Sequence, residues 1–185
     1  ITKQLAKGAN TITVMVTKVA WSSYLEDQDY YRVSGIFRDV YLLGRDKFHV
    51  RDIFVKQDFA PDYSSAELTV ELDFTGKSAL KSPEASVRLY GLLNNLIGEE
   101  KTLIKDGRAI LSFHVEPPLL WTAETPYLYT LVVISGGEYI PVKTGLRKIE
   151  IQDNGAVTIN GTQVKFKGVN RHDTHPDLGH VTPMK

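Results

Sequence analysis

Apolar and polar residues alternate in short runs along most of this chain. The alternation is clearest at Leu68, Val70, Leu72 and Phe74, whose intervening neighbours are polar. A period of two indicates a strand that buries one face and exposes the other. Because no segment of the middle region carries a convincing helical period, the pattern predicts an all-β protein.

The alternation recurs seven times in the middle of the chain, and turn residues such as Thr75-Gly76-Lys77 separate the runs. The predicted strands are Phe48–Phe59, Ala66–Phe74, Ala85–Leu93, Glu99–Ile104, Ala109–Val115, Tyr127–Ser135 and Tyr139–Thr144. Seven short strands in roughly 100 residues match an immunoglobulin-like β-sandwich. We therefore assign residues 46–149 to such a sandwich.

The flanking regions also have the composition of strands. Alternation over Thr11–Val16 and the apolar run Ile36–Leu43 each predict a strand, and two or three strands alone do not make a stable sheet. Residues 1–45 are therefore expected to be the C-terminal part of a larger β domain. After Ile149, the pairs Asn154-Gly155 and Asn160-Gly161 predict hairpin turns, since Asn-Gly tolerates the positive φ angles that such turns need.

A proline-rich insert interrupts the sandwich at residues 117–129. Its three prolines prevent it from pairing as a central strand, and Trp121 is too large to be exposed without a reason. Trp121 is interpreted either as a platform on which a sugar stacks or as a plug that closes one end of the sandwich.

Composition excludes several classes of function. The 185 residues carry 22 basic and 22 acidic side chains and no basic stripe, so a nucleic-acid partner is not expected. The absence of cysteine excludes disulfides and zinc–thiolate sites. No apolar run reaches the length of a membrane span, and the N-terminus lacks signal-peptide order, so a cytoplasmic location away from membranes is expected. Because the chain starts at Ile1 and stops at Lys185 without a closing element, we interpret it as a piece of a longer protein.

Two stretches concentrate candidate chemistry. In the first, Glu26, Asp27 and Asp29 could act as an acid/base pair, as cation ligands, as acceptors for a polyol, or simply as caps and ion-pair partners. In the second, His172 and His175 belong to a group of three histidines within nine residues. Pro176 argues against a helix that would place them on one face, which favours a polar loop lining a pocket over a metal site.

These two stretches carry a resemblance to a known family. The run Tyr24–Asp29, with Arg32–Leu42 two residues later, resembles the end of the sugar-binding domain of family 2 glycoside hydrolases, particularly the large bacterial β-galactosidases. The run Gly168–Asp173, followed by His175-Pro176 and Leu178-Gly179, resembles the loop after the first barrel strand in the same enzymes.

The resemblance implies three domains and a mechanism. Residues 1–45 would be the C-terminal part of a sugar-binding jelly-roll domain, residues 46–149 the linking sandwich, and residues 150–185 the hairpin, first strand and first loop of a catalytic (β/α)₈ barrel. The family's mechanism is retaining hydrolysis by two carboxylates about 5–5.5 Å apart. The resemblance places both glutamates beyond Lys185, so this fragment alone is expected to be inactive.

The resemblance also implies roles for two residues. His172 would bind the galactosyl unit and stabilise the transition state, while Asp29 would bind substrate and help to hold a sodium ion. Magnesium would also bind the full-length enzyme through ligands outside this fragment, and that enzyme is expected to be a homo-oligomer acting on β-galactosides such as lactose. Two departures are a shortened loop at Ser22-Ser23 and Thr174 in a place where histidine is common.

Two alternatives stay open on sequence alone. A β-glucuronidase or β-mannosidase would share the linker and the barrel, although the run Leu25–Asp29 favours galactose. A non-catalytic β-sandwich module that binds carbohydrate or a partner protein is the alternative from a different class.

Overall fold

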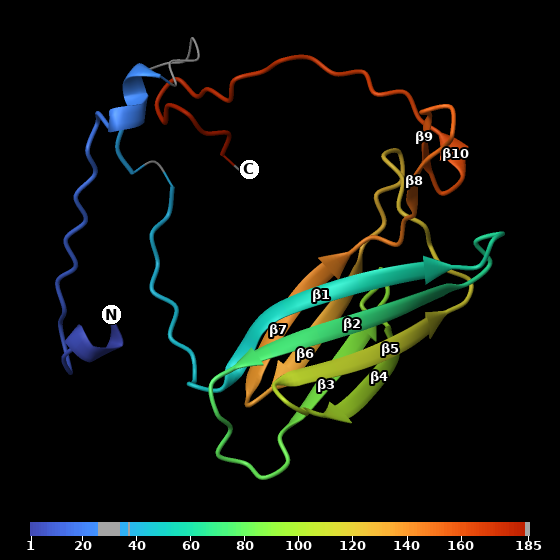
Figure 1. Ribbon diagram of the computed structural model, residues 1–185, viewed down its shortest axis with the longest axis horizontal. Helices are drawn as coiled ribbons and strands as arrows, with labels where there is room; N and C mark the ends of the chain where they lie inside the picture. The colour runs from blue at the N-terminus through green and yellow to red at the C-terminus, as the bar shows by residue number, and fades with distance from the viewer. Residues whose placement is uncertain (26–33, 37, 184–185) are drawn as a thin grey trace. The chain divides into compact units, whose positions relative to one another are not determined.

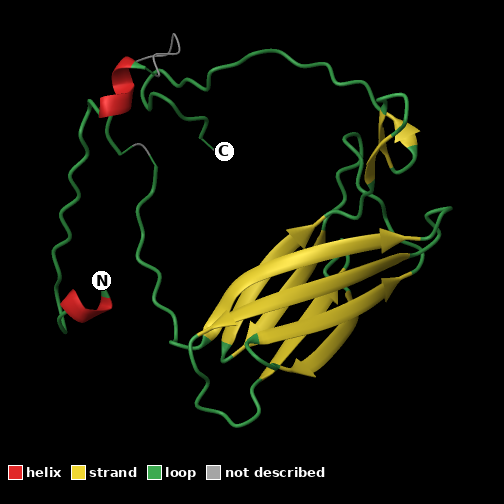
Figure 2. Ribbon diagram, viewed as in Figure 1, coloured by secondary structure: helices red, strands yellow, loops and turns green. Residues whose placement is uncertain are grey.

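The computed structural model of this chain describes residues 1–25, 34–36 and 38–183. The chain divides into two compact units, one formed by Gly44–Phe166 and the other by Ile1–Leu43 together with Lys167–Lys185. Among the described residues, every strand lies in the unit Gly44–Phe166 (Figures 1 and 2).

Two antiparallel sheets form the body of the unit Gly44–Phe166 (Figure 1). The first sheet has the order β1-β2-β5, with β1 at His49–Phe59, β2 at Ala66–Thr75 and β5 at Arg108–Val115. The second has the order β4-β3-β6-β7, with β3 at Glu84–Tyr90, β4 at Leu96–Leu103, β6 at Tyr129–Ser135 and β7 at Glu138–Thr144. All seven predicted strands are present, which confirms the all-β sandwich.

The core lies between the two sheets and consists of the alternating residues identified from sequence. Leu68 and Val70 of β2 are fully buried, as are Val87 and Leu89 of β3. Successive side chains of a strand point to opposite faces, so each strand contributes every second residue to this layer. Burial of one such side chain is worth about 1.5–3 kcal/mol. The alternating pattern therefore supplies the main driving force for this fold.

The two flanking strand predictions are wrong for this structure. Residues 11–16 form no strand, and Ile12, Val14 and Val16 are each at least half exposed. The described part of Ile36–Leu43 also lacks strand structure. A strand persists only where its N–H and C=O groups have a neighbouring strand to pair with, and alternation alone does not supply that neighbour.

The unit that contains these flanks has only short helical turns, η1 at Thr2–Gln4 and η2 at Trp21–Tyr24, within its described residues. Across the described chain, no helix is long and apolar enough to cross a membrane.

A small three-stranded sheet follows the sandwich, in the order β10-β9-β8. Its strands are β8 at Ile149–Ile151, β9 at Val157–Ile159 and β10 at Thr162–Gln163. Asn160 and Gly161 have φ angles of 51° and 74° between the paired residues Ile159 and Thr162, which confirms a two-residue hairpin turn.

The other Asn-Gly pair forms a longer loop. Between β8 and β9, the Gln152 N–H donates to the Ala156 carbonyl at 2.8 Å, and the Asn154 side chain accepts from the Ala156 N–H. The strand ends Ile151 and Val157 pair across this five-residue connection, so Asn154-Gly155 is a turn within a loop and not a two-residue hairpin.

Candidate functional site

The two residues assigned roles by resemblance lie in the unit formed by Ile1–Leu43 and Lys167–Lys185. Asp29, with its neighbours Glu26 and Asp27, lies outside the described residues. His172 is exposed and lies in a segment that has neither helix nor strand structure. The role of Asp29 in sodium binding and the role of His172 at the sugar therefore stay predictions.

The histidine-rich stretch folds into a loop with a tight turn. The His175 N–H donates to the Gly179 carbonyl at 2.8 Å, and the Gly179 N–H donates back at 3.1 Å. The His175 Nδ1 accepts from the backbone N–H groups of Asp177 and Leu178 at 3.1 and 3.2 Å. This ring nitrogen is occupied in stabilising the turn, and the described residues contain no group of three or more His, Cys, Asp or Glu that could hold a metal ion.

The best-defined polar arrangement in the described residues lies where the small sheet joins the sandwich. We call it the joint and define it as Gln57, Trp121, Gly145, Arg147 and Asn160. The backbone N–H of Trp121 donates to the carbonyl of Leu146 at 2.8 Å. The Arg147 guanidinium lies 4.3 Å from the centroid of the Trp121 indole ring. With Gly145 against the indole and a cation above it, Trp121 closes the end of the sandwich, which favours the plug over the sugar platform.

Asn160 ties the small sheet to this plug. Its side-chain amide donates to the Trp121 carbonyl at 3.0 Å, and its Oδ1 accepts from the Lys148 N–H at 3.0 Å. Its own N–H donates to the Lys148 carbonyl at 2.9 Å. A single turn residue therefore connects the insert, the chain leaving β7 and the hairpin.

Gln57, on β1, holds the segment of chain that follows β7. Its side-chain nitrogen donates to the Gly145 carbonyl at 3.0 Å and to the Thr144 hydroxyl at 3.2 Å, and its Oε1 accepts from the Arg147 N–H at 2.9 Å. All the polar atoms of this side chain are used on the chain that leaves β7, so the joint is rigid by hydrogen bonding as well as by packing.

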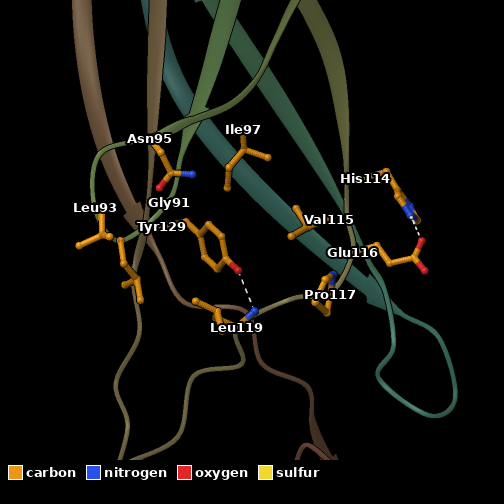
Figure 3. Close-up of a pocket in the computed structure, with 11 residues that line it drawn as sticks. Gly91, Leu93, Asn95, Ile97, His114, Val115, Glu116, Pro117, Leu119 and Tyr129 are labelled. Carbon is orange, nitrogen blue, oxygen red and sulfur yellow. Dashed lines mark hydrogen bonds and ion pairs between the residues drawn. The ribbon is translucent and has the colours of Figure 1, made fainter.

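A pocket of about 510 Å³ lies at the end of the sandwich that carries the joint, since its lining residue Leu119 precedes Leu120, which bridges to Leu146. Figure 3 shows the side chains that line it. Its lining is mostly apolar and comes from the β3–β4 turn, the start of β4, the end of β5 and the proline-rich insert. The lining residues are Gly91, Leu92, Leu93, Asn95, Ile97, His114, Val115, Glu116, Pro117, Leu119 and Tyr129. The buried Tyr129 hydroxyl accepts from the Leu119 N–H at 2.7 Å, which holds the insert across the base of the pocket. The arrangement suits burial of an apolar group better than acid–base chemistry.

One charged cluster borders this pocket. The His114 ring lies between two carboxylates, with Nδ1 2.5 Å from Glu67 Oε1 and Nε2 3.1 Å from Glu116 Oε2. The hydrogen bond with Glu67, and then the one with Glu116, raises the pKa of His114 above its ordinary value. Sequence reasoning missed this cluster because the pairing of Glu67 with His114 depends on the register between β2 and β5. The sequence did show that Glu67 and His114 occupy outward-facing positions of two alternating strands, and this was the signal from which the cluster could have been found.

Comparison with known families identifies the chain. The pattern of glycosyl hydrolases family 2 matches residues 48–147, which is the sandwich. The chain belongs to glycosyl hydrolases family 2. The sugar-binding domain of family 2 matches residues 1–46. The resemblance drawn from the two sequence motifs is thereby confirmed at the level of the family.

Curated relatives of this family 2 chain include two bacterial proteins named β-galactosidase. The protein of Actinobacillus pleuropneumoniae is 41% identical over 181 residues, and that of Staphylococcus xylosus is 40% identical over 181 residues. In both cases the match covers 98% of this chain but only 17% of the relative. The chain therefore spans about one sixth of the length of these relatives.

Solved structures with a similar fold include two β-glucuronidases. The Bacteroides uniformis β-glucuronidase 3 matches 83% of this chain and 20% of its own chain, with a TM-score of 0.67 and 21% identity. The Parabacteroides merdae enzyme matches 74% of this chain and 18% of its own, with a TM-score of 0.61 and 20% identity. At this identity, these neighbours establish the sandwich fold of the family 2 chain and nothing finer.

The joint makes a prediction about packing. A methyl group added at Gly145 would lie 2.8 Å from Trp121 Cδ1, so Gly145→Ala should displace the indole and destabilise the family 2 chain by about 1–3 kcal/mol. Urea unfolding followed by tryptophan fluorescence measures the loss. Gly168→Ala is the control because its methyl group meets open space. Equal stability of the two variants would contradict the tight contact at Trp121.

The charged cluster makes a prediction about pH. Because the pKa of His114 is raised in the folded state, its stabilising effect is complete below the unfolded pKa of about 6.5 and is lost as pH rises through the folded value. Glu67→Gln should move the His114 pKa back towards its ordinary value in an NMR titration of the ring protons. Glu71→Gln, on the same strand but paired with Lys56, should leave it unchanged. A His114 titration that is identical in both variants would show that Glu67 does not set this pKa.

Proposed function

We propose that this chain is part of a retaining β-galactosidase that removes terminal β-galactose from β-galactosides such as lactose. It would supply the end of the sugar-binding domain, the linking sandwich and the entrance to the catalytic barrel. The observation that carries this proposal is the identity of about two residues in five with proteins named β-galactosidase, over nearly the whole chain. The β-glucuronidase neighbours share only about one residue in five with the chain.

The same proposal assigns roles within the active site. Asp29 binds the sugar and helps to hold sodium, and His172 stabilises the charge that develops at the galactosyl unit in the transition state. The nucleophile and the acid/base are glutamates supplied by the rest of the parent chain, which we infer to be a cytoplasmic homo-oligomer. Magnesium would bind the same parent protein through ligands outside this fragment.

A direct assay of the parent protein tests the substrate. The parent should hydrolyse nitrophenyl β-galactoside with retention of configuration, and at a far higher kcat/KM than the corresponding β-glucuronide or β-mannoside. The 185-residue chain alone should show no hydrolysis, since both catalytic carboxylates are missing from it. If the parent prefers the glucuronide or the mannoside, the substrate assignment is wrong and that sugar replaces galactose. If the parent has no glycosidase activity, the non-catalytic binding module is favoured.

Substitutions in the parent test the two assigned residues. His172→Ala should lower kcat by roughly 10²-fold, the cost of losing one contact that strengthens in the transition state. His49→Ala, at the start of β1 and outside the pocket, is the matched control and should leave kcat unchanged. The pH–rate profile shows whether the loss reflects titration or contact.

The sodium role has its own variant. Asp29→Asn should raise both the KM for the galactoside and the sodium concentration needed for half-maximal rate, because one carboxylate ligand is lost. Asp153→Asn, in the exposed loop between β8 and β9, is the control for loss of an acid. If both variants need the same sodium concentration, Asp29 is not a sodium ligand.

A further inference from the structure

The pocket lined by apolar residues opens beside the joint, at the end of the sandwich where β7 delivers the chain to the small sheet. Leu120, which directly follows the pocket residue Leu119, forms a parallel bridge with Leu146 just after β7. The β3–β4 turn lies at this end as well, because β3 and β7 both run antiparallel to β6. The pocket and the joint are therefore neighbours on one surface.

Several aliphatic side chains of the pocket lining are exposed, although Val115 is buried. Leu93 is 91% exposed, and Ile97 and Leu119 are 40% and 45% exposed. These residues come from the β3–β4 hairpin and from the proline-rich insert, which meet around a hollow of about 510 Å³. Figure 3 shows the side chains of this lining. Contiguous exposed apolar surface around a concavity is typical of a site at which another protein segment packs.

The polar groups of the pocket do not favour a sugar as the occupant. The Tyr129 hydroxyl already accepts from the Leu119 N–H, and both ring nitrogens of His114 face carboxylates. A buried sugar hydroxyl needs several hydrogen-bond partners, and the Asn95 amide is the one uncharged polar side chain that this mostly apolar lining adds to Tyr129 and His114. An apolar side chain has no such requirement.

The charge at the rim of the pocket indicates which kind of residue the occupant carries beside its apolar group. Glu116 lines the pocket, and Glu67 contacts the same His114 from β2. Two carboxylates face one histidine, so the rim carries net negative charge whichever form the imidazole takes. A basic residue beside the apolar group would complement this rim.

We propose that this pocket docks an apolar segment, flanked by lysine or arginine, from the rest of the parent chain. This inference rests on the proposed function, in which the parent is a full family 2 enzyme. About five sixths of the length of the curated relatives lies outside the region matched by this chain, and the pocket opens at the end of the sandwich from which β8–β10 continue. A parent segment can therefore reach the pocket without a second molecule.

Hydrogen exchange tests the docking directly. Amides of residues 91–97 and of Glu116, Leu119 and Leu120 should exchange at least about tenfold more slowly in the parent than in the 185-residue chain, because the docked segment excludes water. Exchange at the same rate in the two proteins would overturn the proposal.

A surface substitution provides the second arm. Leu93→Asp should leave the melting temperature of the 185-residue chain unchanged, since the side chain is already exposed there. In the parent it should abolish the slow exchange at residues 91–97. Leu80→Asp is the matched control, because Leu80 is 68% exposed in the loop between β2 and β3. Identical behaviour of the two variants in the parent would overturn the proposal.

Other occupants give different results. Concentration-dependent dimerisation of the 185-residue chain that Leu93→Asp abolishes would assign the pocket to a second copy. NMR shifts at Ile97 and Leu119 on addition of lactose would assign it to a sugar, and either result overturns the proposal. Exchange is read without any enzyme assay, so failure of docking is distinguishable from failure of the β-galactosidase assignment, which appears in the activity of the parent.

Discussion

Pairing of backbone hydrogen-bond groups between strands decides which parts of this chain become regular structure. In the sandwich, each strand has a neighbour in register, and the alternating side chains of both sheets then meet in one dry layer. Residues 11–16 have a similar alternation but no neighbouring strand, and their apolar side chains are exposed. The hydrophobic pattern is the same in both places. The availability of a partner strand makes the difference.

Side-chain hydrogen bonds fix the path of the backbone where the chain enters the sandwich and where it leaves it. At the entrance, the Arg45 guanidinium donates two hydrogen bonds to the Glu138 carboxylate, at 2.9 and 2.6 Å, and fixes the start of β1 to the start of β7. At the exit, Gln57 and Asn160 use their side-chain amides to fix the chain around Trp121. Bidentate and fully satisfied contacts of this kind resist rotation. A linking domain in a multidomain enzyme needs this property more than it needs chemistry of its own.

Much of the fold was predictable from sequence, because periodicity and turn residues are local signals. The seven strands and the Asn160-Gly161 hairpin follow directly from them. The joint was not predictable in detail, since Gln57 and Arg147 are far apart in sequence and meet only after the sheets have formed. The same holds for His114 and Glu67, whose contact depends on strand register. The roles of Asp29 and His172 came from resemblance, because a carboxylate or an imidazole in a loop has no chemistry until its neighbours are known.

Charge and apolar surface separate the pocket on the sandwich from the two polar stretches to which the family resemblance assigns roles. The pocket at the end of the sandwich is mostly apolar, and its imidazole is held between two carboxylates, so it suits the burial of an apolar group better than proton transfer to a sugar. The stretches around Asp29 and His172 are polar and belong to the other unit, which has little regular structure in its described residues. Such residues can reach productive geometry only if rigid neighbours hold them in place. Within the sandwich unit, the joint has this kind of rigidity, since the side-chain amides of Gln57 and Asn160 are both used in hydrogen bonds.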